Sequence, residues 1–227
     1  MGYIVLGVVV VLLVFGPQWY VRQTLHRHSA ERKDLQGTGG ELAEHLIGRF
    51  DLSGVSVAEG GVGEDFYDPK TKRISLSPGH YHGKSIAAVA VAAHEACHAL
   101  QHKEQHKGFM RRQQRITMAL WIERFSALAL MLSPVLFIIT RIPQSTLLTL
   151  VIGLTGLLAS LWVQLMNLPV ELDASFNKAL PLLEEGYLAG QDIPNARKVL
   201  KAAAYTYVAS AMASLLNIGR WITILRR

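Results

Sequence analysis

Two histidines and a glutamate stand within five consecutive residues near the middle of the chain. His94 and His98 are four residues apart, and Glu95 follows the first of them. On a helix, residues i and i+4 share one face, so both imidazoles could bind a single zinc ion at about 2.0–2.1 Å. Glu95 could then take a proton from a zinc-bound water, whose pKa falls towards about 7. The spacing predicts a zinc-dependent hydrolytic site.

The residues before this motif favour the helix that it requires. Residues 86–93 form an alanine-rich, entirely apolar run, and a helix is predicted from residue 86 to about residue 106. The simpler alternative is a core helix with a polar end. A glutamate between two histidines that follow such an apolar run is costly to bury without a metal ion or hydrogen-bond partners. His102 and His106 continue the spacing one and two turns further, where we expect surface positions rather than ligands.

A catalytic zinc site needs a third protein ligand and one open position. The best candidate is Glu171, which follows a long apolar block in the polar-flanked segment 167–175. Its neighbour Asp173 is a candidate to hold the second N–H group of a ligand histidine. Glu171 could instead be an interfacial charge, and Asp173 a salt-bridge partner.

Four apolar blocks predict a membrane protein. The block at residues 3–21 lacks a basic leader and an Ala-x-Ala-like cleavage site, so we expect an uncleaved anchor. Blocks at 121–142 and 145–168 approach the ~20 residues that a span requires, and the short connection between them predicts a hairpin. The block at 202–225 is rich in alanine, which favours close helix packing; it could span the membrane or lie at its interface.

Basic residues predict the orientation of these blocks. Lysines and arginines are frequent between the first and second blocks and recur after the third, whereas the hairpin connection carries only Arg141. The positive-inside rule therefore places residues 22–120 and 169–201 together on the cytoplasmic side. In that arrangement the two spans of the hairpin return Glu171 to the side of His94 and His98.

Composition excludes several other classes of protein. The net charge of +6 comes without interleaved basic and aromatic residues, so we expect no nucleic-acid partner. Cys97 is the single cysteine, which excludes an intrachain disulfide and a cysteine-based zinc cluster. Any metal must be bound by histidines and carboxylates.

Longer motifs resemble those of the bacterial neutral zinc metallopeptidases of the YugP type, which are related in layout to the HtpX and Ste24 membrane gluzincins. Together they cover most of the chain: Gly16-Pro17-Gln18, Tyr67-Asp68-Pro69, Ile74-Ser75-Leu76-Ser77, the segments 92–101 and 168–175 around the candidate ligands, and the segment 203–209. One position departs from the family, since Cys97 stands where glycine is usual. Because its side chain points about 100° away from His98 on a helix, we expect a packed, non-ligand thiol.

The resemblance implies zinc bound by His94, His98 and Glu171, with Glu95 as the catalytic base acting on peptide or protein substrates. It also implies that strand 72–77 receives extended substrate by edge pairing. The oxyanion needs a donor as well. Tyr207 or Tyr205 in the last apolar block is the candidate, although both could be packing aromatics; the loop histidines His80 and His82 are weaker ones.

The expected fold is a mainly α integral membrane protein of a bacterial inner membrane, with three or four membrane helices and a small cytoplasmic α+β, zincin-like domain. Residues 37–50 have the apolar stripe of a helix, and 55–59 and 72–77 are predicted to pair as a small antiparallel sheet. The predicted parts are an anchor (1–21), the cytoplasmic zincin-like domain (22–120), the membrane hairpin (121–168), a cytoplasmic helical segment with the third ligand (169–201) and a membrane or interfacial helix (202–227).

Two other functions stay open at this point. An intramembrane site-2-type protease would place the histidine helix in the bilayer, but Lys84 and Lys103 bracket only a short apolar stretch and no Leu-Asp-Gly motif is found. A non-catalytic membrane scaffold would keep zinc for structure and would close the site with a fourth protein ligand. The main prediction is a membrane-bound endopeptidase, with membrane protein quality control as a role suggested by analogy.

Overall fold

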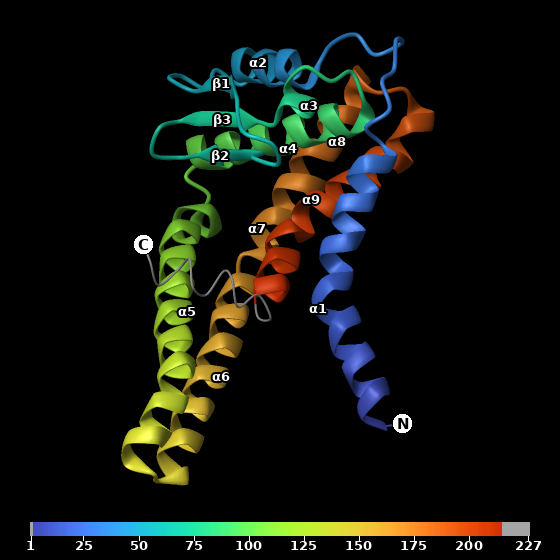
Figure 1. Cartoon of the computed structure of the whole chain (residues 1–227). Coiled ribbons are helices and arrows are strands. Elements are labelled where there is room, and N and C mark those ends of the chain that lie inside the picture. Colours follow the sequence, from blue (N-terminus) through green and yellow to red (C-terminus); the bar gives the residue numbers. More distant parts are fainter. Residues whose placement is uncertain (1, 215–227) are drawn as a thin grey trace. The chain divides into compact units, whose positions relative to one another are not determined.

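The computed structural model describes residues 2–214, and at some helical positions, Tyr207 among them, it describes the backbone alone. The fold is mainly helical with one small sheet (Figure 1). It divides into two units that interleave along the chain. The hairpin unit holds residues 2–18, 111–168 and the described part of 207–227. The site unit holds residues 19–110 and 169–206.

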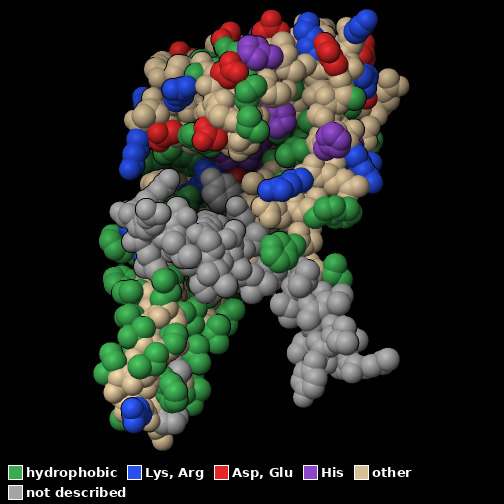
Figure 2. All heavy atoms as spheres, viewed as in Figure 1, with side chains coloured by type: hydrophobic (Ala, Val, Ile, Leu, Met, Phe, Trp, Pro, Cys, Tyr) green, Lys and Arg blue, Asp and Glu red, His purple; other side chains and the backbone are tan. Residues whose placement is uncertain are grey.

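Two long helices dominate the hairpin unit. They are α5 (Lys107–Thr140) and α6 (Pro143–Leu165), with Arg141 in a left-handed conformation at the turn between them. The helical stretches Lys107–Thr140 and Leu147–Tyr187 are long and apolar enough to cross a membrane. Figure 2 shows hydrophobic side chains over much of the visible surface of this pair. The helices α1 (Gly2–Arg27) and α9 (Ile193–Ser214) cover the other apolar blocks; a count of three or four spans remains a prediction, and residues 215–225 lie outside the described part.

Small residues let α5 and α6 approach closely. A Cβ atom on Gly153 would overlap Leu130, and one on Gly156 would overlap the hydroxyl of Ser126. One turn further, Ser160 Oγ and Gln164 Nε2 each donate to the buried Glu123 carboxylate, both at 3.0 Å. The hairpin thus combines the small-residue contacts and interhelical hydrogen bonds that associate helices in a membrane.

The sheet of the site unit has the strand order β1-β3-β2, formed by β1 (Ser56–Glu59), β2 (Phe66–Asp68) and β3 (Arg73–Leu76). β1 runs parallel to β3, and β2 runs antiparallel to it. The predicted antiparallel pairing of 55–59 with 72–77 is therefore wrong. β2 lies between β1 and β3 in the sequence and runs in the opposite direction to both. β3 therefore returns parallel to β1.

The position of β3 also corrects the expectation that strand 72–77 receives substrate along its edge. β3 is paired with β1 over the whole of its length and with β2 from Arg73 to Ser75. Its backbone groups are thus committed to the sheet, and a peptide that pairs with this sheet must use β1 or β2 instead.

The helix α4 (Ile86–Lys103) is the centre of the site unit. It contacts the sheet, α2 (Gly39–Arg49), α3 (Pro78–Tyr81) and the π-helical η1 (Asp173–Ala179). α2, predicted at 37–50, begins with a capping box in which the Thr38 and Glu41 side chains each accept a backbone N–H. Gly39 allows α2 to lie against α4, because a Cβ atom there would overlap the carbonyl oxygens of His80 and Ala88.

The chain completes the site unit with short helices. α7 (Leu168–Leu172) leads into η1, then α8 (Leu180–Leu182), the π-helical η2 (Leu183–Tyr187) and the 3₁₀ turn η3 (Gly190–Asp192) before α9. Bidentate hydrogen bonds from Arg32 to Asp192, both at 3.0 Å, tie this segment to the loop before α2. Every side chain of α4 from Ile86 to Ala99 is buried, so the predicted motif helix forms the core of its unit.

Candidate metal centre

Three side chains predicted as ligands lie together in the site unit. His94 and His98 come from α4, and Glu171 comes from α7. The Nε2 atom of His98 lies 3.0 Å from Glu171 Oε2, and that of His94 lies 3.4 Å from the same oxygen. All three residues are at most 3% exposed, and one potential donor atom from each lies within 4.8 Å of the others. The structure therefore contains a possible metal site made of two imidazoles and a carboxylate.

Two helical segments position these groups by matching spacings. On α4 the histidines are four residues apart, and on the opposing segment Glu171 and Ser175 are also four residues apart. Glu171 contacts His98, whereas Ser175 contacts His94, so the two segments run antiparallel to each other. The second segment passes from α-helix to π-helix at Asp173. Such wider turns are frequent at functional sites.

The hydrogen bonds of Gln101 determine which nitrogen of His98 carries a proton. The Gln101 amide nitrogen donates to the Val170 carbonyl at 3.0 Å and to Asp173 Oδ2 at 2.8 Å, and both partners are acceptors. Its amide oxygen therefore faces His98 Nδ1 at 2.9 Å and accepts from it. His98 Nδ1 therefore donates to Gln101, which leaves Nε2, 3.0 Å from Glu171 Oε2, as the nitrogen that can bind a metal.

Ser175 has the same effect on His94. Its hydroxyl donates its one hydrogen to the Leu200 carbonyl at 3.0 Å, so the oxygen accepts from His94 Nδ1, also at 3.0 Å. His94 Nε2, 3.4 Å from Glu171 Oε2, is likewise left as the nitrogen that can bind a metal. Two imidazole nitrogens and a carboxylate oxygen thus converge, and a cation between them would offset the buried negative charge. Zinc binds this type of donor set, and the residues fit it.

The predicted base, Glu95, lies on α4 beside the two histidines. At 100° per residue its side chain is displaced about 60° from His98 around the helix axis. It is 7% exposed, more than the three candidate ligands, and no described residue forms a hydrogen bond with its carboxylate. That carboxylate is available to a water or substrate that reaches the cluster.

Several other predicted residues do not join the cluster. Asp173 does not contact a histidine; it binds Gln101, one residue further out. His80 binds Asp65 at 2.9 Å, and the exposed His82 lies 3.2 Å from Glu59. The role of Tyr207 stays a prediction, because its side chain lies outside the described part of α9.

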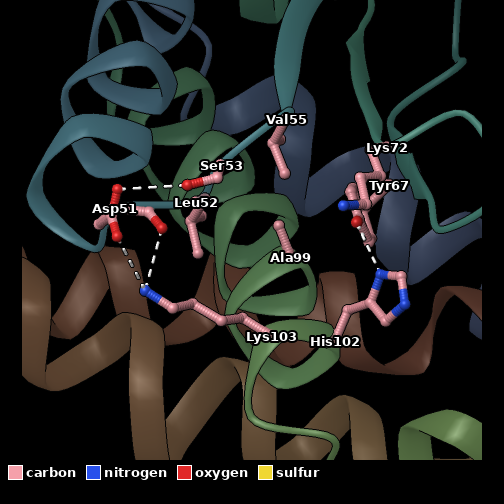
Figure 3. Close-up of a pocket in the computed structure, with 9 residues that line it drawn as sticks. All are labelled: Asp51, Leu52, Ser53, Val55, Tyr67, Lys72, Ala99, His102 and Lys103. Atoms are coloured by element: carbon pink, nitrogen blue, oxygen red, sulfur yellow. Dashed lines mark hydrogen bonds and ion pairs between the residues drawn. The ribbon is translucent and has the colours of Figure 1, made fainter.

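A cavity of about 210 Å³ adjoins the C-terminal half of α4 (Figure 3). His102 lines it, and its Nδ1 atom lies 2.9 Å from the hydroxyl of Tyr67. Burial, with a smaller contribution from Lys72, lowers the pKa of His102. None of the three candidate ligands lines this cavity. His102 is half-buried rather than at the surface position expected for it, and it is engaged with Tyr67.

Gln101 and Ser175 were not among the site residues predicted from the sequence. Both carry a spacing signal, since Gln101 is three residues after His98 and Ser175 is four residues after Glu171. Helical neighbours at these spacings share a face. A search for acceptors at i+3 and i+4 from each candidate ligand would have found them.

Comparisons with known proteins match the chain to a zinc-dependent family. A family model described as "Putative neutral zinc metallopeptidase" matches residues 3–226. The chain is 32% identical to "Putative membrane protease YugP" of Bacillus subtilis (strain 168), over 99% of this chain and 96% of that protein. No solved structure matches. The resemblance seen in the sequence motifs is thereby confirmed, and the chain belongs to the family described as putative neutral zinc metallopeptidases.

Proposed function

We propose that this protein is a membrane-bound, zinc-dependent endopeptidase. The observation that carries the proposal is the buried cluster of His94, His98 and Glu171, with an available carboxylate on Glu95 beside it. The family description supports a peptidase, and two apolar helices support a membrane location.

In this proposal His94 Nε2, His98 Nε2 and a Glu171 oxygen hold the zinc ion. When bound, zinc supplies a Lewis acid that polarises a carbonyl and lowers the pKa of a water towards about 7. Glu95 accepts the proton of the attacking water and delivers it to the leaving amine. Tyr207 is the proposed donor to the oxyanion.

The number of ligands favours catalysis over a structural role for the metal. A structural zinc site is closed by four protein ligands, whereas a catalytic site keeps a position for water or substrate. Within residues 2–214, only three histidine, cysteine or acidic side chains gather at the cluster. This speaks against the scaffold alternative.

The helix α4 itself speaks against the intramembrane alternative. It has 18 residues and is not among the helices that qualify as a membrane span in the described part of the chain. We propose that the site faces the cytoplasm of a bacterial inner membrane, as the distribution of basic residues predicts. Membrane proteins are the proposed substrates, in a quality-control role.

The proposal is tested with the full-length protein in detergent, given casein and a misfolded membrane protein as substrates. Glu95→Gln should retain zinc and lose cleavage by a factor of about 10²–10⁴, the usual contribution of general acid–base catalysis. Glu44→Gln, at an exposed position of α2, is the matched control and should cleave normally. Unchanged cleavage by Glu95→Gln would exclude the mechanism. A zinc-loaded wild type that cleaves neither substrate would favour the scaffold.

A further inference from the structure

We infer that Ser175 and Gln101 are positioning residues that fix both histidines in the zinc-binding tautomer, and that the segment 170–175 controls zinc affinity as a unit. The inference deepens the proposed function, because it concerns the same metal centre. It assigns roles to two residues whose side chains are completely buried and are not predicted ligands.

The two nitrogens of each imidazole ring have different roles in a metal site. A histidine binds a metal through one nitrogen, and a hydrogen bond from the other nitrogen sets the tautomer and the ring orientation. His94 is fixed by Ser175 and His98 by Gln101, at 3.0 and 2.9 Å. Without these acceptors each ring could place its proton on Nε2, where it would occupy the lone pair that a metal needs.

Both acceptors are themselves fixed by further hydrogen bonds. The Ser175 hydroxyl is directed at the Leu200 carbonyl, so it can only accept from His94. The Gln101 amide is held by the Val170 carbonyl and by Asp173, and Asp173 also accepts from Asn177 at 2.9 Å. Neither side chain can therefore rotate to offer a donor to its histidine without losing existing bonds.

These contacts converge on one short segment of the chain. Residues 170–175 supply the proposed third ligand, Glu171, and the acceptor for His94, Ser175. They also supply both groups that orient Gln101, namely the Val170 carbonyl and the Asp173 carboxylate. When this segment packs on α4, one contact surface brings the carboxylate ligand and fixes the tautomers of both histidines. Zinc binding and packing of the segment should consequently stabilise each other.

The first test measures zinc affinity by competition with a chelator, using the full-length protein in detergent. Ser175→Ala and Gln101→Leu should each weaken zinc binding by about 10–100-fold, which is typical for loss of such a partner. Ser77→Ala removes another buried serine of the same unit and should leave zinc affinity within about twofold of wild type, which makes it the matched control.

A rescue separates positioning from simple packing. Gln101→Glu alone places a carboxylate against Asp173 and should weaken zinc binding. In the Gln101→Glu/Asp173→Asn double variant, the new carboxylate at position 101 still accepts from His98, and the new amide at position 173 can donate to that carboxylate. The double variant should therefore recover most of the zinc affinity. In the cobalt-substituted protein, the visible spectrum should change in Gln101→Glu and return to the wild-type form in the Gln101→Glu/Asp173→Asn pair.

The inference would be overturned if Ser175→Ala and Gln101→Leu bind zinc as wild type does. It would also be overturned if the double variant binds no better than Gln101→Glu while its metal-free form unfolds at the wild-type temperature. If Ser175→Ala fails to fold, the Gln101 and Asp173 variants decide the outcome. Zinc affinity is measured without a peptide substrate. The peptidase mechanism, tested by cleavage in Glu95→Gln, and the positioning roles of Ser175 and Gln101 can therefore fail independently of each other.

Discussion

The carboxylate of Glu171 lies 3.0 Å from the Nε2 atom of His98, although 73 positions separate them in the sequence. The intervening chain includes the whole α5–α6 hairpin. A carboxylate buried against two imidazoles would be strongly unfavourable without a compensating cation or proton. The pair is thus the long-range contact on which the proposed zinc site depends, and it is the first point to test.

Glu171→Ala should abolish stoichiometric zinc binding. The substitution removes one of three donors and leaves the two imidazoles facing a small cavity. Zinc content after gel filtration, measured by mass spectrometry of the metal, should fall to less than about a tenth of the wild-type value. Glu185→Ala, an exposed acidic residue in η2, should retain zinc. Full retention by Glu171→Ala would remove this residue from the site.

Asp65 should make the site unit sensitive to acid. Burial raises the pKa of the Asp65 carboxyl, but hydrogen bonds and charge attraction from His80 and hydrogen bonds from Ser77 outweigh it and hold the pKa below its ordinary value. A carboxyl whose pKa is depressed by folding stabilises the fold above its unfolded pKa, near 3.9, and loses this contribution as the pH falls through the folded pKa.

The measurement compares thermal unfolding of wild type and Asp65→Asn as a function of pH. At pH 7 the variant should be less stable by about 1–3 kcal/mol, since a charged acceptor of buried donors is lost. The difference should shrink as the pH falls below about 4. A difference that stays constant down to pH 2 would show that the charge of Asp65 has no stabilising role.

The ligand cluster could be anticipated because each part follows from a simple rule. Helical periodicity aligns His94 with His98, and the distribution of basic residues predicts that Glu171 returns to the same side of the membrane. Gln101 and Ser175 share helical spacings with the candidate ligands, but their orienting role depends on which atom accepts and which donates. That information emerges only when Gln101 is seen between His98 and Asp173.

The sheet could not be derived from the pattern of its strands. β2 has only three residues, too few for alternation to distinguish it from a loop, yet it reverses the chain and makes β1 and β3 parallel. The apolar block at 121–142 also did not predict where α5 begins. The helix begins at Lys107, well before that block, and its first residues, up to Met110, belong to the site unit.

Cys97 should be inert towards thiol reagents in the folded protein. It is 1% exposed, and burial raises the pKa of its thiol well above the ordinary range. Since the thiolate is the reactive form, alkylation by iodoacetamide should be slow in native protein and rapid after denaturation. Mass spectrometry of labelled protein measures both rates. Cys97→Ala should bind zinc as wild type does, and rapid native labelling would contradict the packed position.

Gly156 should determine how closely the two helices of the hairpin pack. A side chain there would overlap Ser126 on α5, and separation of the helices would also weaken the hydrogen bonds from Ser160 and Gln164 to Glu123. Gly156→Leu should therefore destabilise the protein in detergent by about 1–3 kcal/mol, the usual cost of overpacking. Ala159→Leu adds similar bulk at an exposed position of the same helix and should have little effect. Equal stability of the two variants would show that the interface yields to a larger residue, and that the small-residue contact is not what holds α5 against α6.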